Sequence, residues 1–538
     1  MKFFFRTLTS GLTGVAVILG IMMFGSAAQA TITPSSGPAA GGTSVTVEGI
    51  HFVQVAGGSS HTLALTNLGT VYAWGGNNDG ELGNGTFTNS STPVAVMDAQ
   101  GLLPLTGVSQ IAVGDDFSIV LLETGEVYAW GENDYGQLGD GSTTGRALPT
   151  RVKDSDGTGW LSGVSFLALG STHSSAILEN GTVMAWGDNL YGQLGIGTFV
   201  DQLLPVTVKD SSGTTALAGV SAIALGQEHT LALLESGQLM AWGENFSGQL
   251  GDGTTVSRSL PFAVSDASGS GVLSQVAFIG ARGDHSLVIL NTGESYAWGK
   301  NNSGQLGDGT TTNRSRPVRV MDSSGNAPLG STSKIIAGYR SSYAQLSTGE
   351  LVAWGRNSLG ELGDGTTNDS LLPVFVLNAA GDSALTGISL VTSGSSHVVA
   401  VLTSGTTVAW GDNSSYELGI GLSTHYATLP QTSANFQPQS VSFGSNVAGN
   451  LTISSTTWAV VSPVSTAGHV DILATASVFG GATPASPALV TWKAGLFTYE
   501  PVLATTGSPA PVPLGIAATL ALLVGLALLV GWRRVKRS

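Results

Sequence analysis

Five histidines are the side chains of this sequence that could most readily act as general bases or metal ligands. They occupy one position of a repeated phrase and are His61, His173, His229, His285 and His397. Equivalent positions of successive repeats are spread apart by the repeated structure, so these imidazoles should not meet at one ion or substrate. We therefore expect them to be buried, hydrogen-bonded structural residues.

Other catalytic and metal-binding patterns are missing from the sequence. It has no HExxH, GxSxG or phosphate-loop motif and no cysteine, which excludes thiolate ligands, cysteine nucleophiles and disulfides. Aspartates that precede a glycine by three residues are typical of type I turns, whereas a calcium loop needs more convergent oxygens. These aspartates are Asp98, Asp154, Asp210, Asp266 and Asp322. We predict that the chain is not an enzyme and has no catalytic residue, metal or cofactor.

Seven tryptophans, each 56 residues after the previous one, define an internal repeat. They are Trp74, Trp130, Trp186, Trp242, Trp298, Trp354 and Trp410. Each copy contains four short β runs, which in the second copy cover residues 111–113, 117–122, 126–130 and 149–152. Gly125 precedes the third run, where a two-residue hairpin turn needs the positive φ that glycine adopts readily. We expect the tryptophans to pack between repeats and not to form a ligand-binding set.

Four strands cannot bury both of their faces alone, whereas a closed ring of such sheets covers each sheet with its neighbours. The repeat therefore predicts a β-propeller and not an open solenoid. The phrase WGxNxxGQLGxG, with GxxH upstream in most copies, resembles the regulator of chromosome condensation repeat. Members of that family form seven-bladed β-propellers, and the seven copies over residues 53–436 match this number. The copies depart from the phrase at Phe117, Ile196, Ser341, Tyr416 and Ile420.

The segments on either side of the repeats resemble two parts of one domain. Residues 31–52 resemble the opening strands of an immunoglobulin-like plexin and transcription-factor (IPT/TIG) domain, and residues 437–501 resemble its remainder. A short hairpin has no core of its own, and a closed ring brings its two chain ends together. We therefore predict an all-β fold in which a seven-bladed β-propeller is inserted into a split immunoglobulin-like β-sandwich. The alternative is that residues 31–52 are only a leader strand.

The two ends of the sequence predict export. Residues 1–30 have a basic start, an apolar stretch and a small-residue pattern ending at Ala30, which is typical of a cleaved signal peptide. Residues 514–532 carry no charge and are long enough for one C-terminal transmembrane helix. The basic tail of residues 533–538 predicts that the C-terminus is cytoplasmic and that the rest of the chain lies outside.

A short motif in the linker of residues 502–513 precedes this helix. It consists of Leu503, Ala504, Thr505, Thr506 and Gly507. The order of motif, helix and basic tail resembles a Gram-positive cell-wall sorting signal, in which a sortase cuts between Thr and Gly and joins the chain to peptidoglycan. Ala504 departs from the usual proline and matches a variant associated with some actinobacterial sortases. A plain single-pass membrane anchor is the alternative.

The charge of the exported part excludes one class of partner. Without the signal peptide and the basic tail, 14 Lys and Arg residues remain against 35 Asp and Glu residues, a net charge of −21. Such a surface repels phosphate backbones and anionic head groups. We therefore expect no nucleic-acid binding.

The residues that differ between copies predict an interaction rim. Two residues after each tryptophan lie Gly76, Glu132, Asp188, Glu244, Lys300, Arg356 and Asp412. They form an acidic arc on copies two to four and a basic pair on copies five and six. Before the glycine of the GQLG phrase lie Tyr135, Tyr191, Phe246 and Leu359. If this loop lies on one rim, aromatic side chains beside charges predict an interface. The alternative is ordinary variation of a solvated loop.

These features predict an exported, cell-surface-anchored, non-enzymatic binding or adhesion protein with an extracellular protein or glycan ligand. Some eukaryotic members of the resembled family are nucleotide-exchange factors for a small nuclear GTPase. An exported acidic chain would not meet that protein, so we expect no small GTPase partner. Secreted bacterial propellers with similar repeats inhibit β-lactamases, which makes an inhibitor of a secreted enzyme an alternative. A polysaccharide-binding or polysaccharide-degrading surface protein is another, although degradation needs a non-repeated cluster of catalytic groups.

Overall fold

The computed structural model describes residues 32–500, except 35, 39–43, 422–423, 444–445, 448, 455–456, 462–467 and 480–487. The predicted signal peptide, including Ala30, lies outside these residues. So do the linker with its sorting motif, the predicted transmembrane helix and the basic tail. Within the part of the chain that the structure describes, no helix has the length and apolarity that a membrane crossing requires.

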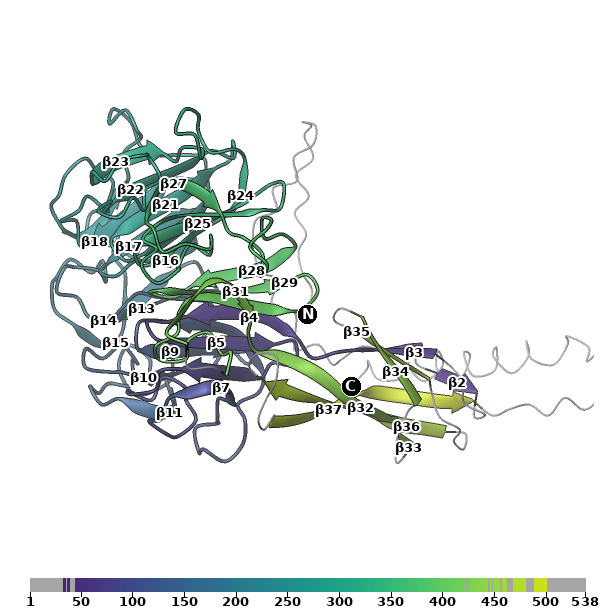
Figure 1. Cartoon of the computed structure of the whole chain (residues 1–538). Helices are drawn as coiled ribbons and strands as arrows, with labels where there is room; N and C mark the ends of the chain where they lie inside the picture. Colours follow the sequence, from purple (N-terminus) through teal and green to yellow (C-terminus); the bar gives the residue numbers. More distant parts are fainter. Residues whose placement is uncertain are drawn as a thin grey trace, which may run out of the picture.

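Seven four-stranded antiparallel sheets follow one another along the chain and form seven blades (Figure 1). Blades one to four consist of β4 (Phe52–Gly57), β5 (His61–Thr66), β6 (Val71–Gly75) and β7 (Ser90–Ala95); β8 (Val108–Val113), β9 (Phe117–Leu122), β10 (Val127–Gly131) and β11 (Arg146–Arg151); β12 (Val164–Leu169), β13 (His173–Leu178), β14 (Val183–Gly187) and β15 (Gln202–Thr207); β16 (Val220–Leu225), β17 (His229–Leu234), β18 (Leu239–Gly243) and β19 (Arg258–Ala263). Blades five to seven consist of β20 (Val276–Arg282), β21 (His285–Leu290), β22 (Ser295–Gly299) and β23 (Arg314–Arg319); β24 (Thr332–Ala337), β25 (Ser341–Leu346), β26 (Leu351–Gly355) and β27 (Ser370–Phe375); β28 (Ile388–Ser393), β29 (His397–Leu402), β30 (Thr407–Asp412) and β31 (Tyr426–Thr432).

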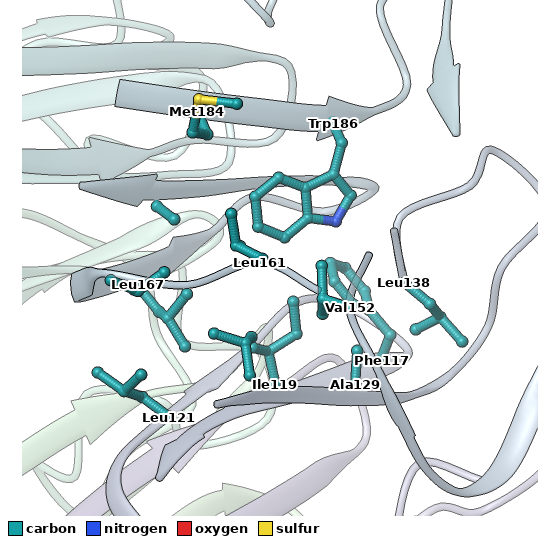
Figure 2. Packing of buried hydrophobic residues seen from close by; sticks show 13 residues of the cluster. Phe117, Ile119, Leu121, Ala129, Leu138, Val152, Leu161, Leu167, Met184 and Trp186 are labelled. Atoms are coloured by element: carbon teal, nitrogen blue, oxygen red, sulfur yellow. The ribbon is translucent and has the colours of Figure 1, made fainter. Parts of the chain in front are cut away.

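The burial of each strand follows from its place in the blade. The second and third strands of blade one, β5 and β6, are buried along their whole length, because adjacent blades cover both of their faces. The outer strand β7 is mostly half-buried. Each core lies between two blades: Phe117 and Ile119 of blade two face Met184 and Trp186 of blade three (Figure 2).

The ring is closed by packing between the first and last blades. The first strands of successive blades contact one another all the way round, from β4 to β28 and back to β4. Phe52 and Trp74 of blade one share a buried cluster with Val399 and Leu418 of blade seven. Each blade consists of four consecutive strands, so the first and seventh blades do not share a strand. The prediction of a closed seven-bladed propeller is confirmed, and an open solenoid is excluded.

The turn between the second and third strands differs from its predicted form. In blade two the Gly125 amide donates to the Leu122 carbonyl at 2.9 Å, and the Leu122 amide donates to the Glu126 carbonyl at 2.8 Å. Leu122 and Glu126, the last hydrogen-bonded pair of the hairpin, are therefore separated by three residues. The third of these, Gly125, has φ +83°. This is a type I turn followed by a left-handed glycine. The positive φ was predicted correctly, but the two-residue loop was wrong.

Strands from both flanks of the propeller share two further sheets. One sheet has the order β1 (Ile32–Thr33), β3 (Ser44–Glu48), β35 (Thr457–Val461) and β34 (Gly449–Ser454). The other has the order β2 (Ser36–Pro38), β37 (Ala488–Glu500), β36 (Gly468–Phe479), β32 (Asn435–Phe443) and β33 (Asn446–Val447). Strand β3 is antiparallel to β35, and β2 is parallel to β37. Figure 1 shows these strands beside blade one. The seven blades thus lie, in sequence, between strands that pair with each other.

Candidate interaction face

The seven repeated tryptophans hold neighbouring blades together. Each indole is fully buried, and its Nε1–H donates to a main-chain carbonyl of the preceding blade. The bonds are Trp74 to Glu417 (2.8 Å), Trp130 to Glu81 (2.7 Å), Trp186 to Gln137 (2.9 Å), Trp242 to Gln193 (2.8 Å), Trp298 to Gln249 (2.8 Å), Trp354 to Gln305 (2.9 Å) and Trp410 to Glu361 (2.9 Å). The prediction that these residues pack between repeats is confirmed.

The five repeated histidines bridge the blades in the same layer. His61 Nε2 lies 2.9 Å from Ser118 Oγ of the next blade, and Ser118 Oγ donates to the Glu81 carbonyl that Trp130 also uses. Because the hydroxyl proton is committed to that carbonyl, Nε2 must carry the ring proton. Burial, followed by the charge of Arg282, lowers the pKa of His61 to about 3, so the ring stays neutral. The prediction of buried structural histidines is confirmed.

The other histidines repeat this geometry. His173, His229, His285 and His397 place Nε2 2.9 to 3.2 Å from a Ser or Thr hydroxyl of the following blade, and burial lowers their pKa values to about 3 or 4. In the described part of the chain, no group of three His, Asp or Glu residues is arranged to hold a metal ion.

Two variable positions of every blade lie side by side at one end of the propeller. In blade two, the amide of Glu132, after the third strand, donates to the carbonyl of Asp116, before the second strand. Asn133 fixes the loop, because its Oδ1 accepts from the Leu138 amide at 3.0 Å and its Nδ2 donates to the Ser142 carbonyl at 3.0 Å. We call this end, formed by the loops equivalent to 58–60 and 76–89 of blade one, the rim face.

The acidic arc predicted on blades two to four lies on the rim face. The amides of Asp188 and Glu244 repeat the bond of Glu132, to the carbonyls of Thr172 and Glu228. Burial, followed by the charge of Asp116, raises the pKa of Glu132 to about 7. The pKa of Glu244 is also raised to about 7, mainly by burial and then by the charge of Asp284. Both carboxyl groups are therefore partly desolvated and lie near other carboxylates.

Glu228 is the most strongly perturbed carboxyl group of the arc. Burial raises its pKa to about 9, and the charges of Asp188, Glu244 and Asp115 contribute. Its Oε2 accepts a hydrogen bond from Gln193 Nε2. The raised pKa shows that blades two, three and four bring their carboxylates close enough to interact.

The predicted aromatic residues lie in the same loops. Tyr191 and Phe246, on blades three and four, meet edge to face with ring centroids 5.5 Å apart. Tyr135 on blade two is 41% exposed, and the charge of Asp188 on blade three is the main cause of its raised pKa. The structure therefore brings Tyr135 and the acidic arc of blades two to four together with the Tyr191–Phe246 pair.

The remaining predicted rim residues are held within their own blades. Lys300 Nζ is 2.7 Å from Asp284 of blade five. Arg356 Nε donates to Ser358 Oγ at 2.8 Å and lies 3.5 Å from Glu361 Oε1 of blade six. The Leu359 amide donates to Glu361 Oε2, and Asp412 Oδ1 accepts from the Ser414 amide. These side chains do not extend the aromatic and acidic cluster.

Sequence reasoning missed three residues of the rim face. Leu190, next to Tyr191, is 62% exposed and occupies the loop position that Phe246 occupies in the next blade. Glu228 and Arg282 lie one and three residues before a repeated histidine, and no role was predicted for them. A signal was present, because the residue before that position is charged in several copies and blade five reads ARGDH where the neighbouring copy reads LGQEH.

Arg282 reaches across the ring axis. Its Nη1 donates to the Gly57 carbonyl of blade one at 2.9 Å, and its Nη2 lies 3.6 Å from Asp115 of blade two. Blades one and two are not neighbours of blade five in a seven-membered ring, so this side chain must cross the centre. In blade four the equivalent residue is Gly226, where a Cβ would lie 2.1 Å from His229 Cε1. Blade five accommodates the arginine by lengthening β20 and placing Gly283 at φ +52°.

The fold and these contacts define a seven-bladed β-propeller whose blades are joined by repeated Trp and His bridges. Sequence comparison matches residues 20–331 to the RCC1-like domain and residues 348–401 to the regulator of chromosome condensation (RCC1) repeat. The chain therefore belongs to the RCC1-like domain family, which confirms the resemblance of its repeats.

Individual relatives agree with this assignment. Ultraviolet-B receptor UVR8 of Arabidopsis thaliana is 31% identical over 339 residues, which are 63% of this chain and 72% of UVR8. E3 ubiquitin-protein ligase HERC2 of Homo sapiens is 33% identical over 271 residues, which are 50% of this chain but 5% of HERC2. The ligase activity in that name is therefore not carried over to this chain.

Two solved structures share the fold. Human WBSCR16 has a TM-score of 0.57 at 22% identity, with 73% of this chain and 99% of that chain covered. Yeast RCC1 (Prp20), bound to Kap60, has a TM-score of 0.55 at 19% identity, with 86% of this chain and 96% of that chain covered. At these identities the likeness concerns the fold alone.

Proposed function

We propose that the chain is a non-catalytic protein-binding platform that presents the rim face of its propeller to a partner. The observation that carries the proposal is the aromatic pair Tyr191 and Phe246, which is presented beside Tyr135 and carboxylates on rigid, interlocked blades. Aromatic side chains lose little conformational entropy on binding and are enriched in interface hot spots. Prp20 of Saccharomyces cerevisiae, which shares the fold, has binding properties toward Gsp1p and histones and occurs bound to Kap60, which supports the use of this fold in protein binding.

We further propose that this platform is displayed at the cell surface. The support is the order of sequence features: a signal peptide ending at Ala30, the motif from Leu503 to Gly507, an apolar segment and a basic tail. The two sheets shared by the flanks would form the split IPT/TIG-like sandwich and act as a stalk. Mass spectrometry of cell-wall digests tests the anchoring, because sortase processing leaves Thr506 joined to a peptidoglycan fragment. An intact mature chain that retains residues 507–538 would show a membrane anchor instead.

Photo-crosslinking on intact cells tests the binding function. A photoreactive residue at position 246 of the full-length chain should give a discrete adduct with another protein. The variant that combines Tyr135→Ala, Tyr191→Ala and a photoreactive residue at 246 should lose most of this adduct. Leu102→Ala with Leu103→Ala, two exposed residues in a loop at the opposite end of the blades, should keep it. No adduct, or equal adducts in all variants, would refute the proposed platform.

A further inference from the structure

Four large side chains, three of them exposed and one half-buried, lie in equivalent loops of blades two to four on the rim face. This aromatic patch consists of Tyr135, Leu190, Tyr191 and Phe246. Leu190 is 62% exposed and Phe246 is 63% exposed, and the Tyr191 and Phe246 rings are in contact across the boundary between blades three and four. Such clusters of large apolar side chains on a surface mark sites that a partner covers.

Carboxylates surround the aromatic patch. In the same loops of blades two to four lie Asp115, Asp116, Glu132, Asp134, Asp188, Glu228 and Glu244. Their negative charge acts on Tyr135, whose pKa is raised by Asp188 and, more weakly, by Glu132, Asp134 and Glu228. Arg282 and Lys300 approach the arc, but each is already held, Arg282 by the Gly57 carbonyl and Asp115 and Lys300 by Asp284.

We propose that this part of the rim face binds a lysine- or arginine-rich segment of a protein partner. The cationic heads would pair with Glu132, Asp188 and Glu244, and the aliphatic stems would lie against the aromatic patch. The inference rests on the proposed binding function and names the chemical class of the partner.

Charge complementarity selects this occupant. A purely apolar partner would cover Glu132, Asp188 and Glu244 without supplying a counter-charge, which is strongly unfavourable for partly buried carboxylates. An anionic partner would add to the existing repulsion. A cation removes that repulsion, and its alkyl stem or guanidinium plane can also lie on an aromatic ring, which adds a cation–π attraction.

Binding of a labelled cationic peptide to the purified full-length chain tests the inference. The probe is a fluorescein-labelled peptide of alternating arginine and leucine, measured by fluorescence anisotropy, with the glutamate–leucine peptide as its counterpart. Glu132→Gln with Asp188→Asn and Glu244→Gln should weaken binding by roughly tenfold or more. Asp156→Asn with Glu179→Gln and Asp382→Asn removes the same number of carboxylates from exposed loops at the opposite end of the blades and should leave binding unchanged.

Further measurements separate the possible outcomes. Phe246→Ala, which removes an exposed ring and leaves the core intact, should also weaken binding, and raising the salt concentration from roughly 0.05 to 0.5 M should weaken binding to the wild-type chain. Equal binding by the two triple variants, or equal binding of the two peptides, would overturn the inference. A dimer in sedimentation that the rim variant abolishes, without peptide binding, would assign the face to a second copy. A cellular crosslink at residue 246 without binding of the cationic peptide would leave the platform intact and overturn only the partner class.

Discussion

At the scale of single residues, the position directly before the leucine of the GQLG phrase carries either glutamine or glutamate. Four blades have Gln at this position, and in blade two Gln137 accepts from the Tyr135 amide and donates to Glu132. Blades one, six and seven have Glu instead, as at Glu417, whose Oε2 accepts from the Ser415 amide at 2.9 Å. A carboxylate cannot supply the donor that the amide has.

Glu417→Gln should therefore stabilise the protein at alkaline pH. Burial raises the pKa of Glu417 from 4.5 to about 7, so the folded state resists ionisation more than the unfolded state. This penalty is absent below about pH 4.5 and grows until pH exceeds 7, where removing it should stabilise the variant by about 1–3 kcal/mol. Thermal unfolding at pH 4 and pH 8 measures the effect. The exposed control Glu179→Gln should change little, and an equal gain for Glu417→Gln at both pH values would contradict the explanation.

At the scale of the strand and turn, two glycines of blade three have positive φ for different reasons. Gly187 ends β14 at φ +98°, where an added Cβ would lie 2.6 Å from the Thr172 carbonyl oxygen and 3.0 Å from His173 Cα. Gly181 turns the preceding hairpin at φ +77°, and the nearest atom to its Cβ would be the Gly219 amide nitrogen at 3.7 Å. Only Gly187 therefore combines backbone strain with a main-chain clash.

Alanine at these two positions should separate the two effects. Gly181→Ala should destabilise the protein by about 1 kcal/mol, the usual penalty for a left-handed backbone conformation. Gly187→Ala should cost about 3 kcal/mol or more, because β13 and β14 must also move apart and the adjacent Trp186 bridge would shift. Midpoints of denaturant unfolding compare the two. Similar losses would show that the close approach at Gly187 relaxes easily.

At the scale of the whole molecule, the ring is held by interfaces that repeat around it, and the chain closes a second unit outside it. Trp74 closes the ring through the Glu417 carbonyl in the same way that each other tryptophan joins adjacent blades. The strand pairing of β3 with β35 then brings together residues that lie on opposite sides of the propeller in the sequence, with Val45 opposite Val460. Both chain ends of the propeller are thereby tied down.

A designed disulfide tests this pairing directly. The chain has no cysteine, so in the variant Val45→Cys with Val460→Cys the two introduced thiols can form a disulfide only with each other within the chain. Directly opposed residues of antiparallel strands have Cα atoms about 4.5–5.5 Å apart, which suits a disulfide. We expect rapid oxidation, seen by peptide mapping. Val45→Cys with Trp458→Cys is displaced by two residues, about 7 Å along the strand, and should oxidise poorly. Failure of the first pair, or equal oxidation of both, would contradict the register.

The candidate site shows how far sequence reasoning reached. The acidic arc and the aromatic residues were predicted because they vary at fixed positions of a regular repeat. Glu228 was missed because its interactions with Asp188 of blade three and Asp115 of blade two cross blade boundaries. Arg282 was missed because its partners, Gly57 and Asp115, lie far away in the sequence and meet it only across the ring.

The sequence by itself determined the seven-fold repeat, the four strands of each blade and the structural roles of the tryptophans and histidines. These follow from local periodicity, since every copy repeats the same hydrogen-bonding and packing problem. The tertiary structure alone decided which loops share the rim face, how far their carboxylates are desolvated and which side chain crosses the axis. Those properties depend on distances between residues of different blades, and such distances exist only once the ring has closed.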